Sequence, residues 1–304
     1  MRPAWSVVFL TTLIGAAQGL FLAVYAGAMH ADARFAVAGA VVAVVLAALG
    51  LIASFFHLGR PERAWRSAAM WRTSWLSREV IALPAFMALA AAYAAAMYNG
   101  SGAAIAIGAV ACVAAAALFV CTANIYACIR FLQEWASGFT LANFVLMGCA
   151  SGLTLAVPLA ALLAPQLAWP YAFAAVVATI VALAVRAASL ARNARIVRKS
   201  TIQSAIGIHH PVVEQRSQGF TASAFNTREF FHGVSTGGMR RVRVTFLLLA
   251  FVLPVPLVLA GMKAGSLAVL CIAVLVQYAG LVAERWFFLA QATHPQNLYY
   301  QRKA

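Results

Sequence analysis

Long apolar runs alternate with short polar segments along this chain, and eight of the runs are long enough to be membrane spans. They cover roughly residues 6–29, 35–57, 79–98, 103–129, 141–164, 169–191, 244–262 and 266–290. A helix needs about 20 mostly apolar residues to cross about 30 Å of hydrocarbon. The runs are rich in Ala, Val and Leu and poor in ionisable groups, as lipid-facing helices are. The pattern predicts an all-α integral membrane protein, a bundle of eight transmembrane helices forming a single domain over residues 1–304.

The composition points to the same class of protein. Apolar residues make up 64% and charged residues 10% of the 304 residues, whereas a soluble domain has about 45–50% apolar and about 25% charged residues. A self-standing soluble enzyme, a disordered chain and a secreted disulfide scaffold are therefore disfavoured.

The basic residues gather on one side of the predicted bundle. With eight spans, both termini and the connections after the second, fourth and sixth helices share a side, and this side holds 20 of the 22 Lys and Arg residues. Lys and Arg accumulate in cytoplasmic loops, so both termini are predicted to be cytoplasmic. Because the membrane already explains the positive charge, we do not expect nucleic acid as a partner.

Metal-binding and haem-binding residues are few and poorly placed. None of the five cysteines forms a C-x-x-C pair, the spacing typical of iron–sulfur and zinc sites. The six histidines do not supply two axial ligands within the spans. We therefore expect no haem and no metal in this chain.

One polar constellation falls at the predicted cytoplasmic ends of the second and third helices. His57 precedes Gly59 and Pro61, which end a helix, and Glu79 follows Ser77, a residue type that caps helix N-termini. His57 and Glu79 are thus expected at one membrane level on adjacent helix ends. Ionisable groups at the hydrocarbon boundary are costly and are candidates for function.

Such a pair suits a quinone, a lipid-soluble carrier that takes up protons together with electrons. One group would hydrogen-bond a ring carbonyl and the other would exchange the proton, because His titrates near neutrality and burial raises the pKa of a Glu toward it. The structural alternatives are a capping role for His57, an ion pair of Glu79 with Arg78 or Arg60, and an interfacial aromatic belt. The other predicted site residues are the polar Arg60, Arg66, Ser77 and Arg78 and the apolar Trp65, Trp71 and Trp75.

His57-Leu58-Gly59-x-Pro61, the aromatic-rich turn after it and Leu76-Ser77-x-Glu79 resemble the membrane-anchor subunits of dimethyl-sulfoxide-reductase-type molybdoenzymes. Arg60 departs from the pattern, since several relatives have a small residue there. The resemblance implies a haem-free, eight-span subunit in the bacterial inner membrane, with His57 and Glu79 taking part in quinol binding. It also implies electron exchange between a quinone (ubiquinone or menaquinone) and an iron–sulfur subunit that is paired with a molybdopterin catalytic subunit.

Other segments resemble the anchor of a cytoplasm-facing sulfite dehydrogenase in the same superfamily. They are residues 1–12, the stretch around His209-His210-Pro211, and residues 226–233. The motif also lies on the basic side, whereas the catalytic subunits of dimethyl sulfoxide reductase itself sit outside the cytoplasmic membrane. This resemblance implies electrons that flow from sulfite oxidation to quinone.

The predicted cytoplasmic loop between the sixth and seventh helices, residues 192–243, is too long to be a passive link. We predict a docking platform for the iron–sulfur subunit, because attraction to lipid head groups does not require phenylalanines. The alternative is a solvated basic loop held by anionic lipids. The candidate docking residues are Arg192, Arg195, Arg198, Phe220, Phe225, Phe230 and Phe231.

Three other functions stay open: a quinol-oxidising anchor of a dimethyl sulfoxide or polysulfide reductase, a secondary transporter, and a purely structural anchor. A transporter would show inverted repeats and polar groups near the bilayer centre, whereas the constellation above lies at one interface. The small-residue pairs Gly15-x-x-x-Gly19 and Gly148-x-x-x-Gly152 are expected to let helices approach closely.

Overall fold

The computed structural model describes residues 1–56, 58–214, 216–217 and 225–300, except for the side chain of Asn226. Within these residues eight helical spans are long and apolar enough to cross a membrane, which confirms the predicted class of all-α membrane protein. The first six spans are α1 (Trp5–Gly27) with the short η1 (Ala28–His30), α2 (Ala33–Phe55), α3 (Trp75–Tyr98), α4 (Ala104–Ala127), α5 (Gly138–Leu163) and α6 (Pro165–Ala194). The seventh span, Thr236–Ala264, consists of α9 (Thr236–Leu247), η3 (Leu248–Val252) and α10 (Pro254–Ala264), and the eighth is α11 (Leu267–Ala290).

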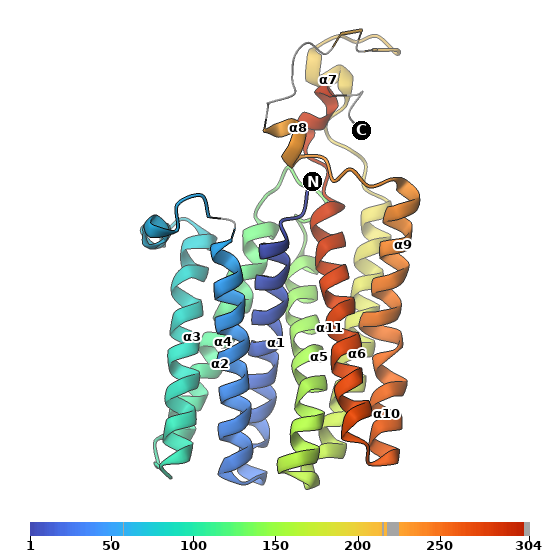
Figure 1. Ribbon diagram of the computed structural model, residues 1–304. Helices are drawn as coiled ribbons and strands as arrows, with labels where there is room; N and C mark the ends of the chain where they lie inside the picture. Colours follow the sequence, from blue (N-terminus) through green and yellow to red (C-terminus); the bar gives the residue numbers. More distant parts are fainter. Residues whose placement is uncertain (57, 215, 218–224, 301–304) are drawn as a thin grey trace.

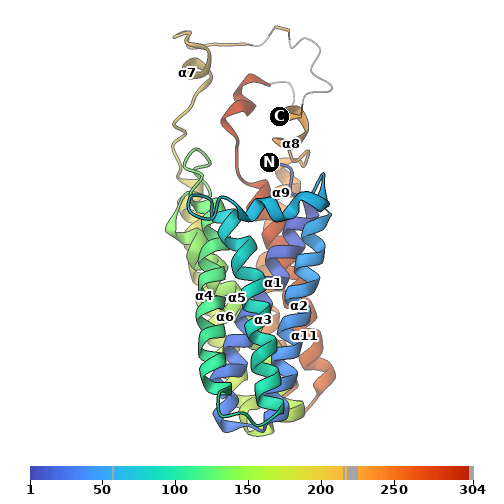
Figure 2. The same ribbon diagram turned by 90° about the vertical axis from the view of Figure 1, so that its left-hand side faces the viewer.

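The spans form two groups of four that pack side by side (Figures 1 and 2). Helices α1 to α4 contact one another in one group, and α5, α6, α9–η3–α10 and α11 do so in the other. Helix α1 joins the groups, because it packs against α5 and α11 as well as against α2 and α4. The junction between the groups is therefore lined by α1, α4, α5 and α11.

Glycines make the contact between α1 and α5 possible. A Cβ atom placed on Gly19 would lie 2.0 Å from the carbonyl oxygen of Gly148, and one on Gly152 would lie 2.0 Å from the carbonyl carbon of Gly19. Both distances are far below van der Waals contact, so no larger side chain fits at either position. The predicted role of small residues in close helix packing is confirmed for Gly19, Gly148 and Gly152, whereas a Cβ on Gly15 would meet its nearest neighbour, Gly148 Cα, at an ordinary 3.7 Å.

Both ends of the described chain lie at the same end of the bundle, which we call the head side (Figure 1). The long connections also lie there, with four short helices: η2 (Pro61–Ala68), α7 (Ile202–Ile206), α8 (Asn226–Glu229) and η4 (Pro295–Tyr299). Only short turns join the spans at the opposite end, the far side. Arg34 lies in the first turn of α2 there and Lys263 in the last turn of α10, so these two predicted exceptions do lie apart from the other described basic residues.

The connection between the sixth and seventh spans is shorter than the predicted 192–243. Helix α6 continues to Ala194, and α9 begins at Thr236, where the Ser235 side chain caps it by accepting from the Gly238 amide at 3.1 Å. The connection is thus 195–235. The predicted span begins at residue 244 because the apolar run starts only after Arg240 and Arg241. The helix itself begins earlier, at Thr236, and includes both arginines.

Candidate functional site

The predicted site begins in the segment between α2 and α3, where an arginine fixes the chain. The Nε atom of Arg78 donates to the carbonyl of Trp71 at 2.9 Å, and one of its terminal nitrogens donates to the carbonyl of Arg72 at 2.8 Å. The Arg78 guanidinium also lies 4.3 Å from the centre of the Trp75 ring. Arg78 therefore holds this segment against the first turn of α3.

The start of α3 differs from the prediction. The N-cap is Ser74, whose hydroxyl accepts from the Ser77 amide at 3.3 Å, and Ser77 itself is a buried residue in the first turn. The capping role expected for Ser77 was wrong because another serine three residues earlier takes it. Helix α3 consequently begins at Trp75, four residues before the predicted start.

The Glu79 side chain is buried in the interior of the bundle, one turn into α3. It is 6% exposed, and its Oε1 atom accepts a hydrogen bond of 2.5 Å from the hydroxyl of Thr122 on α4. The alternative pairing with Arg78 or Arg60 does not occur, since neither arginine lies within 4 Å of the carboxylate. A buried carboxylate with a single neutral partner is costly to keep, which makes Glu79 a candidate for function.

The remaining predicted site residues lie nearer the surface. Arg60 and Arg66 are exposed, as are Trp65 and Trp71, and Trp75 is half-buried. The Arg66 guanidinium lies 5.5 Å from the Trp65 ring centre. These residues form a basic and aromatic segment across the top of α3 (Figure 2), a composition typical of membrane–water interfaces. His57 lies outside the described residues, so its distance to Glu79 stays a prediction.

A buried ionic cluster at the head-side end of α6 and α11 was not predicted. The Arg186 guanidinium lies 2.7 Å from Glu284 Oε1, and Arg285 Nε lies 3.9 Å from Glu284 Oε2. All three side chains are buried. The cluster also contacts an aromatic ring: the Arg285 guanidinium lies 3.7 Å from the centre of the Phe144 ring. With two arginines and one glutamate, the cluster carries a formal charge of +1.

The count of 20 basic residues on one side of the predicted bundle included Arg186 with the loop after the sixth helix and Arg285 with the C-terminal end, which was wrong, although both fall within the predicted spans 169–191 and 266–290. Helix α6 extends past Arg186, and α11 extends past Arg285, so both guanidinium groups are inside the bundle. The signal was present in the sequence: Glu284 and Arg285 interrupt an otherwise apolar run, and ionisable residues within spans are functional candidates by default.

A small cavity lies at the junction of the two helix groups, with residues of α1, α4, α5 and α11 in its lining. Thr122 and Arg285 both line it, together with Thr11, Thr12, Gln18 and Ser151 among its polar residues. Thr122 therefore faces the cavity and also donates to Glu79. The hydrogen-bond partner of Glu79 and one arginine of the ionic cluster therefore line the same cavity.

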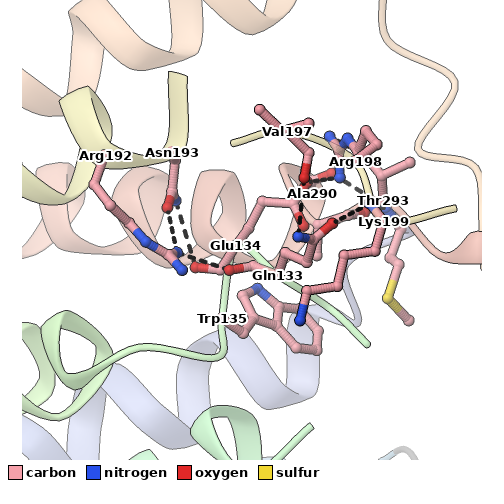
Figure 3. Close-up of polar contacts among 12 residues, drawn as sticks. Gln133, Glu134, Trp135, Arg192, Asn193, Val197, Arg198, Lys199, Ala290 and Thr293 are labelled. Carbon is pink, nitrogen blue, oxygen red and sulfur yellow. Dashed lines mark hydrogen bonds and ion pairs between the residues drawn. The ribbon is translucent and has the colours of Figure 1, made fainter. Parts of the chain in front are cut away.

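The described residues of 128–137, 195–235 and 291–300, which we call the head, form a second candidate region. It is built around the α4–α5 connection (Figure 3). Arg192 donates to the carbonyl of Gln133 at 2.7 Å, and the guanidinium of Arg198 lies 2.7 Å from the buried Glu134 carboxylate. The Gln133 side chain in turn donates to the carbonyl of Val197 at 3.2 Å. Arg192 and Arg198, two of the arginines predicted for docking, therefore tie α6 and the segment after it to the α4–α5 connection.

The predicted docking phenylalanines have different surroundings. Phe230 stacks on His294 with ring centres 3.8 Å apart, and Phe231 meets Tyr300 edge to face at 6.5 Å. Phe225 is 68% exposed, Arg195 is also exposed, and Phe220 lies outside the described residues. Of the predicted docking residues with described side chains, Phe225 and Arg195 are thus the most available to a partner.

A groove of about 1080 Å³ opens beside this head network. Phe230, Phe231 and Met239 give it an apolar wall, and the chain start at Met1 forms its base. The Met1 amine donates to the carbonyls of Ala290 and Ala292 at 3.1 and 2.9 Å. The N-terminus is therefore bound at the end of α11.

Two features of the described chain define its class: eight helices long and apolar enough to span a membrane, in two packed groups, and a folded head at the end of the bundle where both ends of the described chain lie. Across residues 1–300 the sequence matches the family model described as DMSO reductase anchor subunit (DmsC), and the chain belongs to this family. It is 51% identical over 325 aligned positions, covering all of both chains, to a sulfite dehydrogenase subunit from Allochromatium vinosum. The predicted anchor class is confirmed.

Proposed function

We propose that this chain is the quinone-linked membrane anchor of a complex in which a molybdopterin subunit oxidises sulfite and an iron–sulfur subunit transfers the electrons. The observation that carries the proposal is the buried Glu79 carboxylate, close to the head-side end of α3 and hydrogen-bonded to Thr122. The full-length similarity to a sulfite dehydrogenase subunit supports sulfite as the source of electrons.

The residues at this end fit a quinone. Reduction of a quinone consumes two electrons and two protons, and the Glu79 carboxyl, close to the head-side end of α3, would supply one of these protons. His57 would donate a hydrogen bond to a ring carbonyl. The exposed Trp65 and Trp71 rings provide flat apolar surface at the level where a lipid-soluble ring would enter.

The head side is proposed to face the cytoplasm of a bacterium with the chain in the inner membrane. Support comes from the described basic residues: apart from Arg186 and Arg285, which are buried in the bundle, all but Arg34 and Lys263 lie at the head side. Trypsin added to sealed vesicles tests this orientation at the exposed Arg216 in the 195–235 connection. Cleavage is expected in inside-out vesicles and not in right-side-out vesicles, and the reverse result would contradict it.

The quinone role is tested by Glu79→Gln in the complete complex. The variant is expected to lower sulfite-dependent reduction of decylubiquinone by about 100-fold or more, because general acid–base groups contribute about 10²–10⁴-fold. Reduction of a soluble dye that takes electrons directly from the iron–sulfur subunit should not change. Glu62→Gln is the matched control, since Glu62 is an exposed carboxylate on η2.

Unchanged quinone reduction in the Glu79→Gln variant would contradict a role for this carboxylate and would favour a purely structural anchor. A parallel loss of dye reduction would show damage to the complex instead, so the two assays separate the quinone site from assembly.

A further inference from the structure

The cavity between the two helix groups lies close to the head side. Thr122 and Arg285 are each five residues from the head-side end of their helices, or about 8 Å at 1.5 Å per residue. The polar residues that line it come from α1, α4, α5 and α11. Its surroundings above are aromatic, with Phe144 and Phe288 in contact with the Arg285 guanidinium.

The size of the cavity determines whether it can hold a quinone ring or only water. It offers about 20 Å³ of room for water centres, and a cavity needs about 10–15 Å³ by this measure to hold one water. A quinone ring is many times larger. The cavity can therefore hold one or two waters and cannot hold the ring.

The polar groups around the cavity meet the needs of a buried water, which makes about two to four hydrogen bonds. Arg285 is nine-tenths buried or more, and its Nε atom has no hydrogen-bond partner in the described chain. Glu284 is shared between Arg186 and Arg285, so the charge of Arg285 is only partly balanced. The Thr122 hydroxyl donates to Glu79 and keeps its lone pairs free to accept from a water.

We propose that water in this cavity connects Arg285 to Thr122 and reloads Glu79 with protons during quinone reduction. This inference rests on the quinone role of Glu79 proposed above. Arg285 is a positioning residue: its positive charge turns the water oxygen toward itself and the water hydrogens toward Thr122. Proton movement is thereby directed toward the carboxylate.

The proton balance closes without another reactant. When Glu79 gives a proton to the quinone, the Thr122 hydroxyl passes its own proton to the carboxylate and takes one from the cavity water. That water regains a proton from solvent on the head side, and the electrons come from the iron–sulfur subunit. Arg285 stays protonated throughout, because guanidinium does not lose its proton in proteins.

The test compares three threonine variants in the complete complex. Thr122→Val removes the hydroxyl at nearly constant volume, Thr122→Ser keeps it, and Thr154→Val removes a buried hydroxyl on α5 that bonds to the Ala150 carbonyl outside the cavity lining. We expect Thr122→Val to lower kcat for decylubiquinone on the order of tenfold and to raise the solvent deuterium isotope effect. KM for decylubiquinone should stay within about twofold, as should both constants in the two other variants.

Two outcomes would overturn the relay. Wild-type kcat and isotope effect in Thr122→Val would show that Glu79 receives its protons elsewhere, and an equal loss in Thr122→Ser would indicate packing rather than the hydroxyl. Glu79→Gln distinguishes failure of the relay from failure of the quinone site. If Glu79→Gln blocks quinone reduction while Thr122→Val does not, the site stands and the relay falls; if Glu79→Gln has no effect, both fall.

Discussion

The guanidinium of Arg186 and the carboxylate of Glu284 lie 2.7 Å apart, and each side chain is 1% exposed. This ion pair joins α6 to α11 inside an apolar bundle, next to the second guanidinium of Arg285. Removing one partner of a buried pair leaves an uncompensated charge. The free-energy cost of that charge is larger than the net stabilisation that the intact pair provides.

We therefore expect Glu284→Gln to destabilise the protein by about 3–5 kcal/mol, because two buried guanidinium groups lose their shared counter-charge. Thermal unfolding in detergent, followed by helical circular dichroism, measures the change. Glu62→Gln is the control, since Glu62 and Arg63 form an exposed pair at 3.9 Å that is worth at most about 1 kcal/mol. Equal melting temperatures for the two variants would show that the cluster does not depend on Glu284.

The sequence alone predicted the class of fold well, because hydropathy determines where a chain can cross a bilayer. It predicted span ends less well. Helix α9 begins eight residues before the predicted span, since the charged turns around Arg240 and Arg241 stay helical outside the apolar run. A hydropathy pattern detects the membrane boundary, whereas a helix ends where its hydrogen bonds end.

The candidate site was predicted in part for a similar reason. Glu79 stood out because an ionisable group at the hydrocarbon boundary is costly and is a candidate for function. Its partner Thr122 is 43 positions away on another helix, and no local pattern indicates such a contact. Arg186 and Arg285 were counted with loop charges because a sum over loops treats every arginine near a span end as exposed.

The contact between α1 and α5 gives a second stability prediction. Gly152→Ala is expected to lower the free energy of unfolding by at least about 1–3 kcal/mol, the usual cost of overpacking, because the new Cβ would meet backbone atoms of Gly19 and Leu20 at 2.0 and 2.1 Å. Backbone atoms cannot relieve the clash by changing rotamer, as a side chain can, so α1 and α5 must move apart. Thermal unfolding in detergent measures the effect.

Gly102→Ala is the matched control for this substitution. Gly102 lies in the far-side turn before α4, and a Cβ atom there meets nothing within 4 Å. Its melting temperature should stay close to that of the wild type. A Gly152→Ala variant as stable as Gly102→Ala would mean that α1 and α5 are not held at the distance described.

The docking role predicted for the head leads to a prediction about its exposed residues. Phe225→Ser and Arg195→Glu are each expected to weaken binding of the iron–sulfur subunit by about tenfold or more, the effect of losing an interface anchor. Both side chains are exposed, so the head should stay folded. The measurement is retention of the partner subunits on the tagged anchor at increasing dilution.

Tyr98→Ser controls for the loss of an exposed aromatic ring, because Tyr98 is 80% exposed at the far-side end of α3. It should retain the partner subunits like the wild type. If all three variants retain them equally, the partner docks elsewhere on the head.

The head is also expected to loosen as the pH falls from about 8 to about 6. Burial lowers the pKa of the Met1 amine from 8.0 to about 6, against the opposing charge of Glu134. Burial also lowers the pKa of His232 and His294 below 6.5, and the N-terminal charge adds to this shift. All three groups bind protons more weakly when the head is packed on the end of the bundle than when it is detached from it.

The sign follows from proton linkage. At pH values between the pKa of a group in the packed head and its pKa in the detached head, the detached head binds more protons. The packing of the head on the bundle therefore becomes more stable as the pH rises. For the Met1 amine this interval is about pH 6 to 8 and amounts to at most about 3 kcal/mol, at 1.36 kcal/mol per pKa unit. The two histidines extend the same trend below pH 6.5.

Hydrogen exchange of residues 1–12 and 288–300 at pH 6 and pH 8, corrected for the intrinsic pH dependence of exchange, measures this effect. Protection should be greater at pH 8 in both segments and equal in the far-side turn at 99–103. His294→Asn keeps a side-chain acceptor for the Gln296 amide, now 3.2 Å from His294 Nδ1, and removes one titrating group, so the change below pH 6.5 should shrink. Equal protection at both pH values would mean that the buried amine does not govern how the N-terminus is held on α11.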